Sequence, residues 1–174
     1  MNLRWIAIVF LSSFFYTGQV GQAQFGFFRS APEVEDISAK ELYQTLLSRS
    51  KEVEKAKQSG AEPAKSEFII VDVRSAEEYQ ISMIPGAITK QDYERNAAAY
   101  ANVTVIPYCT VGGRSAQYAR DLAAKGVKVL NFKESIIGWC QAKLPLVTVD
   151  GTSTNQVHTY NSRNKVPAEY KAVY

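Results

Sequence analysis

One cysteine and the glycine-rich loop that follows it are the residues of this sequence best suited to chemistry. Cys109 follows the apolar run 103–108 and precedes Gly112, Gly113 and Arg114, after which a helix is expected. The glycines allow successive backbone N–H groups to point inward, and a helix N-terminus attracts anions. Together with a guanidinium, these groups favour the thiolate, which is the nucleophilic form of cysteine. The pattern therefore indicates an activated cysteine with an anion-binding loop around it.

Each feature alone has a simpler structural explanation. A lone cysteine after a strand is usually a small buried apolar residue, and a Gly-Gly pair before a helix usually forms a turn. The arginine five residues after Cys109 and the helix that begins at once favour the chemical interpretation of the combination. We interpret Tyr108 as a packing residue. The chemical interpretation requires a sulfur at position 109 that is ionised and reachable from solvent.

The elements around the loop alternate between strands and helices. Apolar runs predict strands at 68–73, 103–108, 127–130 and 146–149. Capping patterns and apolar spacing predict helices over 39–57, from residue 75, and over 91–101, 115–125 and 135–142. This alternation predicts an α/β domain with a central, mostly parallel β-sheet flanked by helices. Ligands of such sheets bind at the carboxyl ends of the strands, and both Arg74 and Cys109 follow such ends.

Length and composition narrow the possible functions. The 174 residues are enough for one domain with its own core, and the formal charge of +3 is too small to indicate nucleic-acid binding. The sequence has one histidine, His158, and two cysteines, Cys109 and Cys140, which is too few for a structural zinc site. We therefore expect no metal and no organic cofactor. The sequence predicts no oligomeric state.

Residues 1–23 have the layout of a secretory signal peptide. Arg4 supplies a positive charge, an apolar run of 12 residues occupies 5–16, and a small-x-small cleavage site ends at Ala23. That run is short for a transmembrane helix, which needs about 20 residues. We expect export to the periplasm or secretion, with no stable membrane insertion after cleavage; an uncleaved N-terminal anchor is the alternative. An irregular aromatic arm over 24–34 then leads into the domain.

Export raises the question of a disulfide, because oxidising compartments tend to pair thiols. A bond between Cys109 and Cys140 would block the chemistry proposed above. We expect two free thiols instead, because Cys140 follows Trp139 in a segment with the pattern of a packed helix.

Several motifs in combination resemble the single-domain rhodaneses. The motifs are Asp72-Val-Arg74 with Glu78-Tyr79, then Ile84-Pro85-Gly86-Ala87, then Tyr108-Cys109-x-x-Gly112-x-Arg114-Ser115, then a Leu-x-x-x-Gly-x-x-Val passage, and finally Trp139. The resemblance covers 35–147 and implies the rhodanese-like fold for that range. Residues 148–174 lie beyond it and are expected to form a surface-packed C-terminal extension, in which His158 is read as a structural residue.

The resemblance implies a sulfurtransferase. Cys109 would accept a sulfane sulfur from a small anionic donor such as thiosulfate, forming a persulfide, and a thiol or cyanide would take it. The residues that would bind the donor through the loop are Thr110, Val111, Gly112, Gly113 and Ser115. Arg114 is expected to bind the donor's sulfonate with two hydrogen bonds. Arg74 is read first as a structural residue and second as a substrate contact.

The sequence departs from the family pattern in two places near this site. Met83 stands where many members have histidine, and we expect it to pack. Glu134 and Ser135 stand where many members have two glycines. If those glycines adopt positive φ, Glu134 would be strained by about 1 kcal/mol. Its carboxylate would also weaken anion binding near Cys109.

Two other functions compete with sulfur transfer. Cysteine phosphatases also combine a cysteine, a loop of N–H groups and an arginine, but with the spacing Cys-x5-Arg, whereas Cys109 and Arg114 have the spacing Cys-x4-Arg. The shorter loop argues against a phosphatase. The second alternative is a non-enzymatic sulfur carrier or protein-binding module, which Glu134 and the extension over 148–174 motivate.

Overall fold

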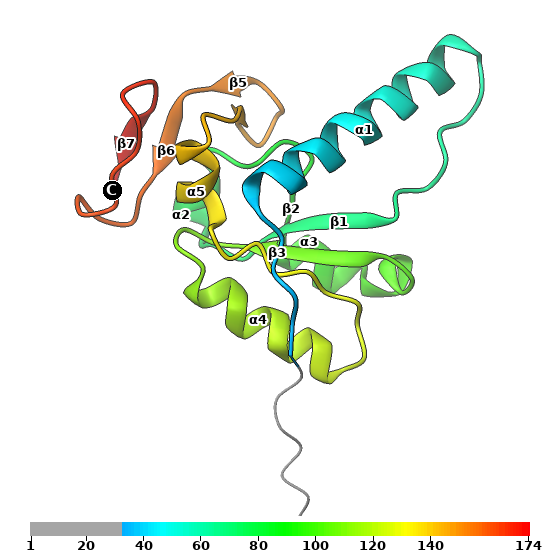
Figure 1. Cartoon of the computed structure of the whole chain (residues 1–174), viewed down its shortest axis with the longest axis horizontal. Coiled ribbons are helices and arrows are strands. Elements are labelled where there is room, and N and C mark those ends of the chain that lie inside the picture. The colour runs from blue at the N-terminus through cyan, green and yellow to red at the C-terminus, as the bar shows by residue number, and fades with distance from the viewer. Residues whose placement is uncertain (1–32) are drawn as a thin grey trace, which may run out of the picture.

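A parallel sheet of three strands, in the order β2–β1–β3, lies at the centre of residues 33–174, which are the residues that the computed structural model describes (Figure 1). β1 is Phe68–Asp72, β2 is Ile88–Thr89 and β3 is Thr104–Tyr108. β1 and β3 pair along their whole length, from Phe68 opposite Thr104 to Asp72 opposite Tyr108. The predicted α/β class with a parallel sheet is confirmed.

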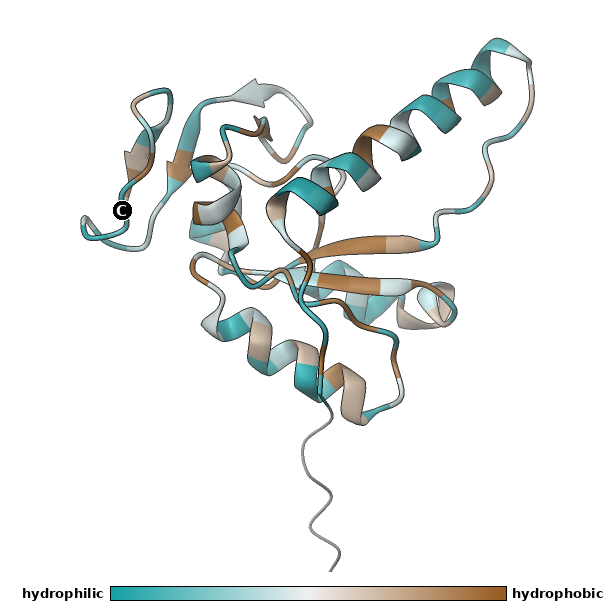
Figure 2. Ribbon diagram, viewed as in Figure 1, coloured by the Kyte–Doolittle hydropathy of each residue, from teal (hydrophilic) through white to brown (hydrophobic). Residues whose placement is uncertain are grey.

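Apolar side chains cover both faces of the two long strands. Ile70 and Ile106 pack with α1 (Ala39–Gln58) and α5 (Ser135–Gln141), whereas Val71 and Val105 pack with α3 (Lys90–Arg95) and α4 (Gly113–Ala124). Neighbouring residues of a strand point to opposite faces, so a strand buried on both faces has a continuous apolar run. Figure 2 shows these strands as the most hydrophobic part of the sheet, while the second half of α1 is mostly hydrophilic.

The helix ends follow the capping signals of the sequence. Ser38 and Glu41 form the expected capping box at the start of α1, and Gly126 has a φ of +81° just after the end of α4. The short helix α2 spans Ala76–Tyr79. The single helix predicted over 91–101 is wrong, because the chain leaves the α-helix at Asn96 and continues as the 3₁₀ helix η1, Ala97–Tyr100.

The strand predicted at 127–130 is also wrong. Only Val129 forms a bridge, parallel to Val105 of β3, and Asn131 then pairs with Asp36 of the N-terminal segment. The chain therefore touches the sheet edge for one residue and moves on to another partner. The apolar run at 127–130 predicts burial, but the length of a strand is set by how many of its residues pair with a neighbouring strand.

The C-terminal extension is built into the fold more deeply than expected. β4 (Leu146–Val147) pairs with β5 (Ser153–Thr154), and β6 (Gln156–His158) pairs in parallel with β7 (Lys171–Val173). Val157 is fully buried in the same core as Trp139 and Leu146. Figure 1 shows β5, β6 and β7 beside α2 and α5, at one end of the molecule. The expected surface-packed tail is thus a set of short strands with Val157 in the main core and Val166 and Tyr170 packed against it.

The signal peptide predicted over 1–23 and nearly all of the arm predicted over 24–34 lie outside the described residues. Within 33–174, the structure has no helix of the length and apolar character that a membrane crossing requires.

Candidate active site

The strand, the loop and the helix that carry Cys109 have the arrangement expected from the sequence. Cys109 directly follows β3, and α4 begins at Gly113, two residues before the predicted start. Gly112 between them has a φ of +94°, and a Cβ at this position would overlap the backbone carbonyl of Lys133. Only glycine therefore fits at this turn. The thiol lies between the carboxyl end of a strand and the amino end of a helix.

Hydrogen-bond donors surround the Cys109 sulfur. The Gly112 N–H donates to Sγ at 3.1 Å, and the Ser135 hydroxyl lies 3.8 Å from it. Burial raises the pKa of the thiol, but hydrogen bonds from the Ser115 backbone, the Ser135 hydroxyl and the Gly112 backbone outweigh burial, so that the pKa of Cys109 lies below its ordinary value. The loop is therefore suited to stabilise an anionic sulfur.

The same sulfur is not open to solvent. Cys109 is only 1% exposed, so the expectation of a reachable sulfur is wrong for this structure. Thr110 and Ser115 on either side of the loop are buried as well, while Val111 at its tip is exposed. The loop closes around the sulfur because its N–H groups point inward. A donor can contact the sulfur only after the loop or a neighbouring side chain moves.

Cys140 is neither bonded to Cys109 nor similarly reactive. Both cysteines are free and buried, as expected for the thiols. Burial raises the pKa of Cys140 to about 12, so this thiol stays protonated near neutral pH. The two sulfurs thus have opposite environments.

Ser135 is a site residue that the sequence argument missed. It is fully buried, and its hydroxyl accepts a hydrogen bond from the Cys109 N–H at 3.0 Å; its one proton has two acceptors within reach, the Phe132 carbonyl at 3.0 Å and the Cys109 sulfur at 3.8 Å. Its φ of +55° is in the left-handed region, which residues other than glycine rarely adopt. The signal in the sequence was the replacement of a family glycine, which predicts a positive φ.

The expected strain and repulsion at Glu134 are both wrong. Glu134 has an ordinary helical φ of −66°, so the strained residue of the pair is Ser135. The Glu134 carboxylate accepts a hydrogen bond from the Ala39 N–H at 2.9 Å, at the first residue of α1. The N-terminus of a helix stabilises a carboxylate, so Glu134 is used to begin α1.

Arg114 is held by a carboxylate. Its terminal nitrogens donate to the two carboxylate oxygens of Glu78 at 2.6 and 2.7 Å, and the Thr110 hydroxyl donates to Glu78 at 2.6 Å. Burial raises the pKa of Glu78, but the bonds from Arg114 and Thr110 prevail and lower it to about 2. The expected two-point contact between Arg114 and a donor sulfonate is therefore already taken by Glu78, and the positive charge of the guanidinium is balanced.

Glu78 is the second site residue that the sequence argument missed. The motif Ser75-x-x-Glu78 reveals only the capping role of Glu78, whose carboxylate accepts a hydrogen bond from the Ser75 N–H at 3.1 Å. The pairing with Arg114 joins residues 36 positions apart, and spacing along the chain does not reveal it.

Arg74 lies beneath the sheet end and is not an exposed substrate contact. Its side chain is fully buried, donates to the Asp72 carboxylate at 2.6 Å and to the Ser82 carbonyl at 2.6 Å. Tyr108, also fully buried, donates its hydroxyl to Asp72 as well. These bonds make Arg74 a structural residue at the end of β1, in line with our first reading of it.

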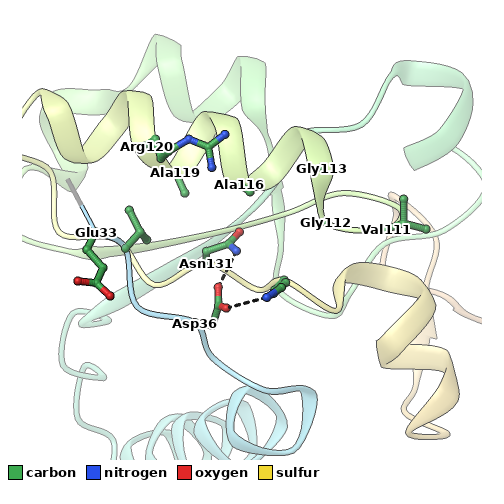
Figure 3. Close-up of a pocket in the computed structure, with 11 residues that line it drawn as sticks. Glu33, Asp36, Val111, Gly112, Gly113, Ala116, Ala119, Arg120 and Asn131 are labelled. Carbon is green, nitrogen blue, oxygen red and sulfur yellow. Dashed lines mark hydrogen bonds and ion pairs between the residues drawn. The ribbon is translucent and has the colours of Figure 1, made fainter. Parts of the chain in front are cut away.

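A groove of about 540 Å³ lies outside the loop and is lined in part by the loop residues Val111, Gly112 and Gly113. Figure 3 shows it between α4, the loop at Val111 to Gly113 and the N-terminal segment that carries Asp36. Cys109 is not among its lining residues. This groove is therefore not the passage to the sulfur in the structure as it stands. Within 33–174, no cluster of three or more acidic, histidine or cysteine side chains could hold a metal.

Comparison with known proteins shows the family. The model of the family described as "Rhodanese-like domain" matches residues 50–142, and the chain belongs to this family. Over 65 residues, 37% of this chain, it is 42% identical to a tRNA sulfurtransferase of Desulfurococcus amylolyticus, and it spans only 13% of that relative's length. The expected rhodanese-like fold and the expected family are confirmed.

Two solved structures are similar to part of the chain. A rhodanese-like domain protein from Staphylococcus aureus has 26% identity and a TM-score of 0.45, with 61% of this chain and 91% of that chain covered. A thiosulfate sulfurtransferase from Pseudomonas aeruginosa has 24% identity and a TM-score of 0.46, with 66% of this chain and 20% of that chain covered. The family implies sulfur transfer as the kind of reaction, with donor and acceptor partners.

Proposed function

We propose that this protein is a sulfurtransferase that moves a sulfane sulfur from a donor such as thiosulfate to a thiophilic acceptor through a persulfide on Cys109. The observation that carries the proposal is the set of hydrogen bonds at the Cys109 sulfur, which lowers the pKa of the thiol despite burial. A thiolate is the form that attacks a sulfur donor. Family membership supports the same reaction class.

The reaction has two displacement steps. The Cys109 thiolate attacks the sulfane sulfur of thiosulfate; the new S–S bond forms, the bond to the sulfonate sulfur breaks, and its electron pair leaves with sulfite. The product is the persulfide anion of Cys109. An acceptor thiolate or cyanide then attacks the outer sulfur, and the electron pair of the broken bond returns to Cys109. The loop N–H groups of Gly112 and its neighbours stabilise sulfur anions in both steps.

The net charge around the loop affects how strongly the site attracts an anionic donor. Because Glu78 neutralises Arg114, the side chains around the loop offer a dianion such as thiosulfate less attraction than a free guanidinium would. The anion is instead held by backbone N–H groups and the start of α4. We therefore propose thiosulfate as a donor that the site accepts.

Purified protein assayed with thiosulfate and cyanide tests the proposal. We expect thiocyanate to form, and mass spectrometry to find one added sulfur on Cys109 after incubation with thiosulfate alone. Cys109→Ser removes the nucleophile and should abolish both signals with little loss of stability. Full transfer activity in Cys109→Ser would exclude the mechanism. An aryl phosphate in a parallel assay tests the phosphatase alternative, which dominant phosphate hydrolysis would favour.

A non-enzymatic sulfur carrier or protein-binding module is the second candidate. The observation in its favour is the 1% exposure of Cys109, since a binding module needs no access to the sulfur. Absence of the added sulfur after incubation with thiosulfate, in protein whose Cys109 is reduced, would support this candidate.

We also propose that the protein is exported, to the periplasm or outside the cell, on the basis of the signal-like residues 1–23. N-terminal sequencing of protein recovered from cell fractions tests this. A first residue at Gln24 in the exported fraction is expected, and an intact Met1 in the membrane fraction would indicate the N-terminal anchor.

A further inference from the structure

The C-terminal extension places an exposed aromatic residue in an unusual conformation. Tyr160 has a φ of +68° and is 67% exposed. A bulky aromatic side chain rarely adopts the left-handed region, and a residue kept there against its preference is a reason to look for a function. Tyr160 is also one of the few large apolar side chains that the described residues leave in solvent.

Hydrogen bonds on both sides hold this turn in place. Thr159 is fully buried, and its N–H donates to the Val173 carbonyl at 2.8 Å. The Asn164 side chain donates to the Thr159 carbonyl at 2.7 Å, and the Tyr160 N–H donates to His158 Nδ1 at 3.2 Å. β6, which leads into the turn, contacts α2, the helix that carries Glu78. The turn is therefore fixed relative to the active site.

The ring of Tyr160 faces the guanidinium of Arg114. The ring centre lies 6.0 Å from the central guanidinium carbon, at the outer limit of a cation–π contact. Glu78 binds the edge of the same guanidinium, and the side chain of Arg114 is otherwise 44% exposed. The hydrogen bond with Glu78 raises the pKa of Arg114, and the nearby Cys109 thiolate acts in the same direction. Arg114 thus lies between the sulfur, the carboxylate and the ring.

We propose that Tyr160 is a positioning residue of the active site, supplied by the C-terminal extension, which covers one face of the Arg114 guanidinium and keeps it bound to Glu78 beside the Cys109 sulfur. Without the ring, a half-exposed guanidinium can exchange its bonds for water and move away. The Glu78 carboxylate, which binds Thr110 and is almost fully buried, then loses its positive partner, so the field at the neighbouring Cys109 sulfur becomes less positive. This inference concerns the charge at the site proposed for sulfur transfer. Only the measurement of KM and kcat depends on that proposed function.

Two alkylating reagents measure this charge without requiring turnover. Iodoacetate is an anion and iodoacetamide is neutral, and both react with the thiolate, so the ratio of their rates at Cys109 reports the local positive field. Mass spectrometry separates Cys109 from Cys140. Tyr160→Ala should lower the ratio by up to about two- to five-fold, because losing a partly exposed cation–π contact shifts the equilibrium between paired and released Arg114 by no more than that factor. It should raise KM for thiosulfate by a similar factor with little change in kcat.

Two variants serve as controls. Tyr160→Phe keeps the ring and should retain the wild-type ratio. Tyr174→Ala removes another exposed tyrosine of the same extension and should change nothing. The Nε–H signal of Arg114 in nitrogen–proton NMR spectra gives a direct structural readout, because a nearby ring displaces it; we expect it to move in Tyr160→Ala and not in Tyr174→Ala.

The outcomes separate the two proposals. An Arg114 signal that stays in place in Tyr160→Ala, or a ratio that falls as far in Tyr160→Phe as in Tyr160→Ala, overturns the role of Tyr160 and leaves sulfur transfer standing. Absence of sulfur transfer by the wild-type protein overturns the proposed function, while the NMR signal and the alkylation ratio still decide the role of Tyr160.

Discussion

The Cys109 thiol shows how a buried group can still be acidic. Burial alone would raise its pKa, as it does for Cys140, whose pKa is about 12. The difference lies in hydrogen bonds that one sulfur receives from Ser115, Ser135 and Gly112, which outweigh burial in Cys109. The chemistry of this site therefore depends on a few donors, of which the backbone N–H groups are fixed by the loop and the Ser135 hydroxyl can be removed by substitution.

The hydroxyl of Ser135 stabilises the site through a hydrogen bond, whereas its positive φ strains the backbone, and two substitutions separate these two effects. Ser135→Ala removes the hydroxyl but keeps a residue with φ near +55°, so the buried Cys109 N–H loses its acceptor; we expect a loss of about 1–3 kcal/mol in unfolding free energy. Ser135→Gly removes the same hydroxyl but relieves the strain, and should be more stable than Ser135→Ala by about 1 kcal/mol. Urea unfolding measures both values.

Both Ser135 variants should raise the pKa of Cys109, because each lacks the hydroxyl near the sulfur. The pH dependence of alkylation at Cys109 measures this change. Ser162→Ala, at an exposed serine, is the control and should alter neither stability nor the pKa. Equal stability of the Gly and Ala variants would show that the conformation at Ser135 carries no strain.

Glu78 makes the stability of the protein depend on acidic pH. Its pKa is about 2 in the folded protein and about 4.3 in an unfolded chain. The pairing with Arg114 therefore stabilises the fold fully above about pH 4.3, and this contribution is lost as the pH falls towards 2. Glu78→Gln should lower the unfolding free energy at pH 7 by about 1–2 kcal/mol, since solvent screens the half-exposed Arg114.

The difference between wild type and Glu78→Gln should shrink steadily between pH 4.3 and pH 2, which unfolding curves at several pH values measure. Glu169→Gln is the matched control, because Glu169 forms an equally short pair with Lys143 in a more exposed position. A difference that stays constant with pH would show that Glu78 acts through packing and not through its charge.

At the scale of elements, the junction between β3 and α4 depends on two adjacent glycines with different roles. Gly112→Ala should destabilise the fold by more than about 2 kcal/mol, because its φ is +94° and the new Cβ would overlap the Lys133 carbonyl. Gly113→Ala meets no atom within 4 Å at the first residue of α4, and should be neutral or stabilising by up to about 1 kcal/mol. Thermal unfolding and the thiocyanate assay measure both variants.

A Gly112→Ala variant as stable and active as Gly113→Ala would contradict this account of the loop. In that case the loop would have to reach the same positions for its N–H groups with a different backbone at residue 112.

Local signals predicted the elements that local interactions decide. The capping box at Ser38 set the start of α1, and continuous apolar runs located β1 and β3 to within one residue at each end. One prediction failed where a distant partner decides. The strand at 127–130 is a single bridge because Asn131 pairs with Asp36 of the N-terminal segment. The helix at 91–101 failed for a local reason instead, because Asn96 leaves the helical conformation and its side chain donates to the Asp92 carbonyl.

At the scale of the whole molecule, the site also contains residues that are neighbours in the chain and residues that only the fold brings together. The sequence identified Cys109 and its loop, because these residues are neighbours in the chain. It did not identify Glu78, Ser135 or Tyr160, which reach the loop from other elements through the fold. It also missed the burial of Cys109, because exposure is set by what the whole chain packs around the loop.

The extension beyond residue 147 is part of the same folding unit, and one buried valine tests this. Val157 is fully buried in the core that contains Trp139. The Tyr170 hydroxyl also donates to the Leu144 carbonyl at 2.6 Å, which ties the end of the extension to the segment after α5. Val157→Ala removes packed methyl groups and should lower the unfolding free energy by about 1–3 kcal/mol in a single cooperative transition.

Val149→Ala is the control, since Val149 is 60% exposed and its truncation should change stability by less than about 0.5 kcal/mol. Urea unfolding followed by fluorescence reports the result, because Trp139 lies in the shared core. If Val157→Ala leaves this transition unchanged, or splits it into two, the extension folds separately. The turn at Tyr160 would then not be held rigidly against the active site, and the positioning role proposed for it would lose its structural basis.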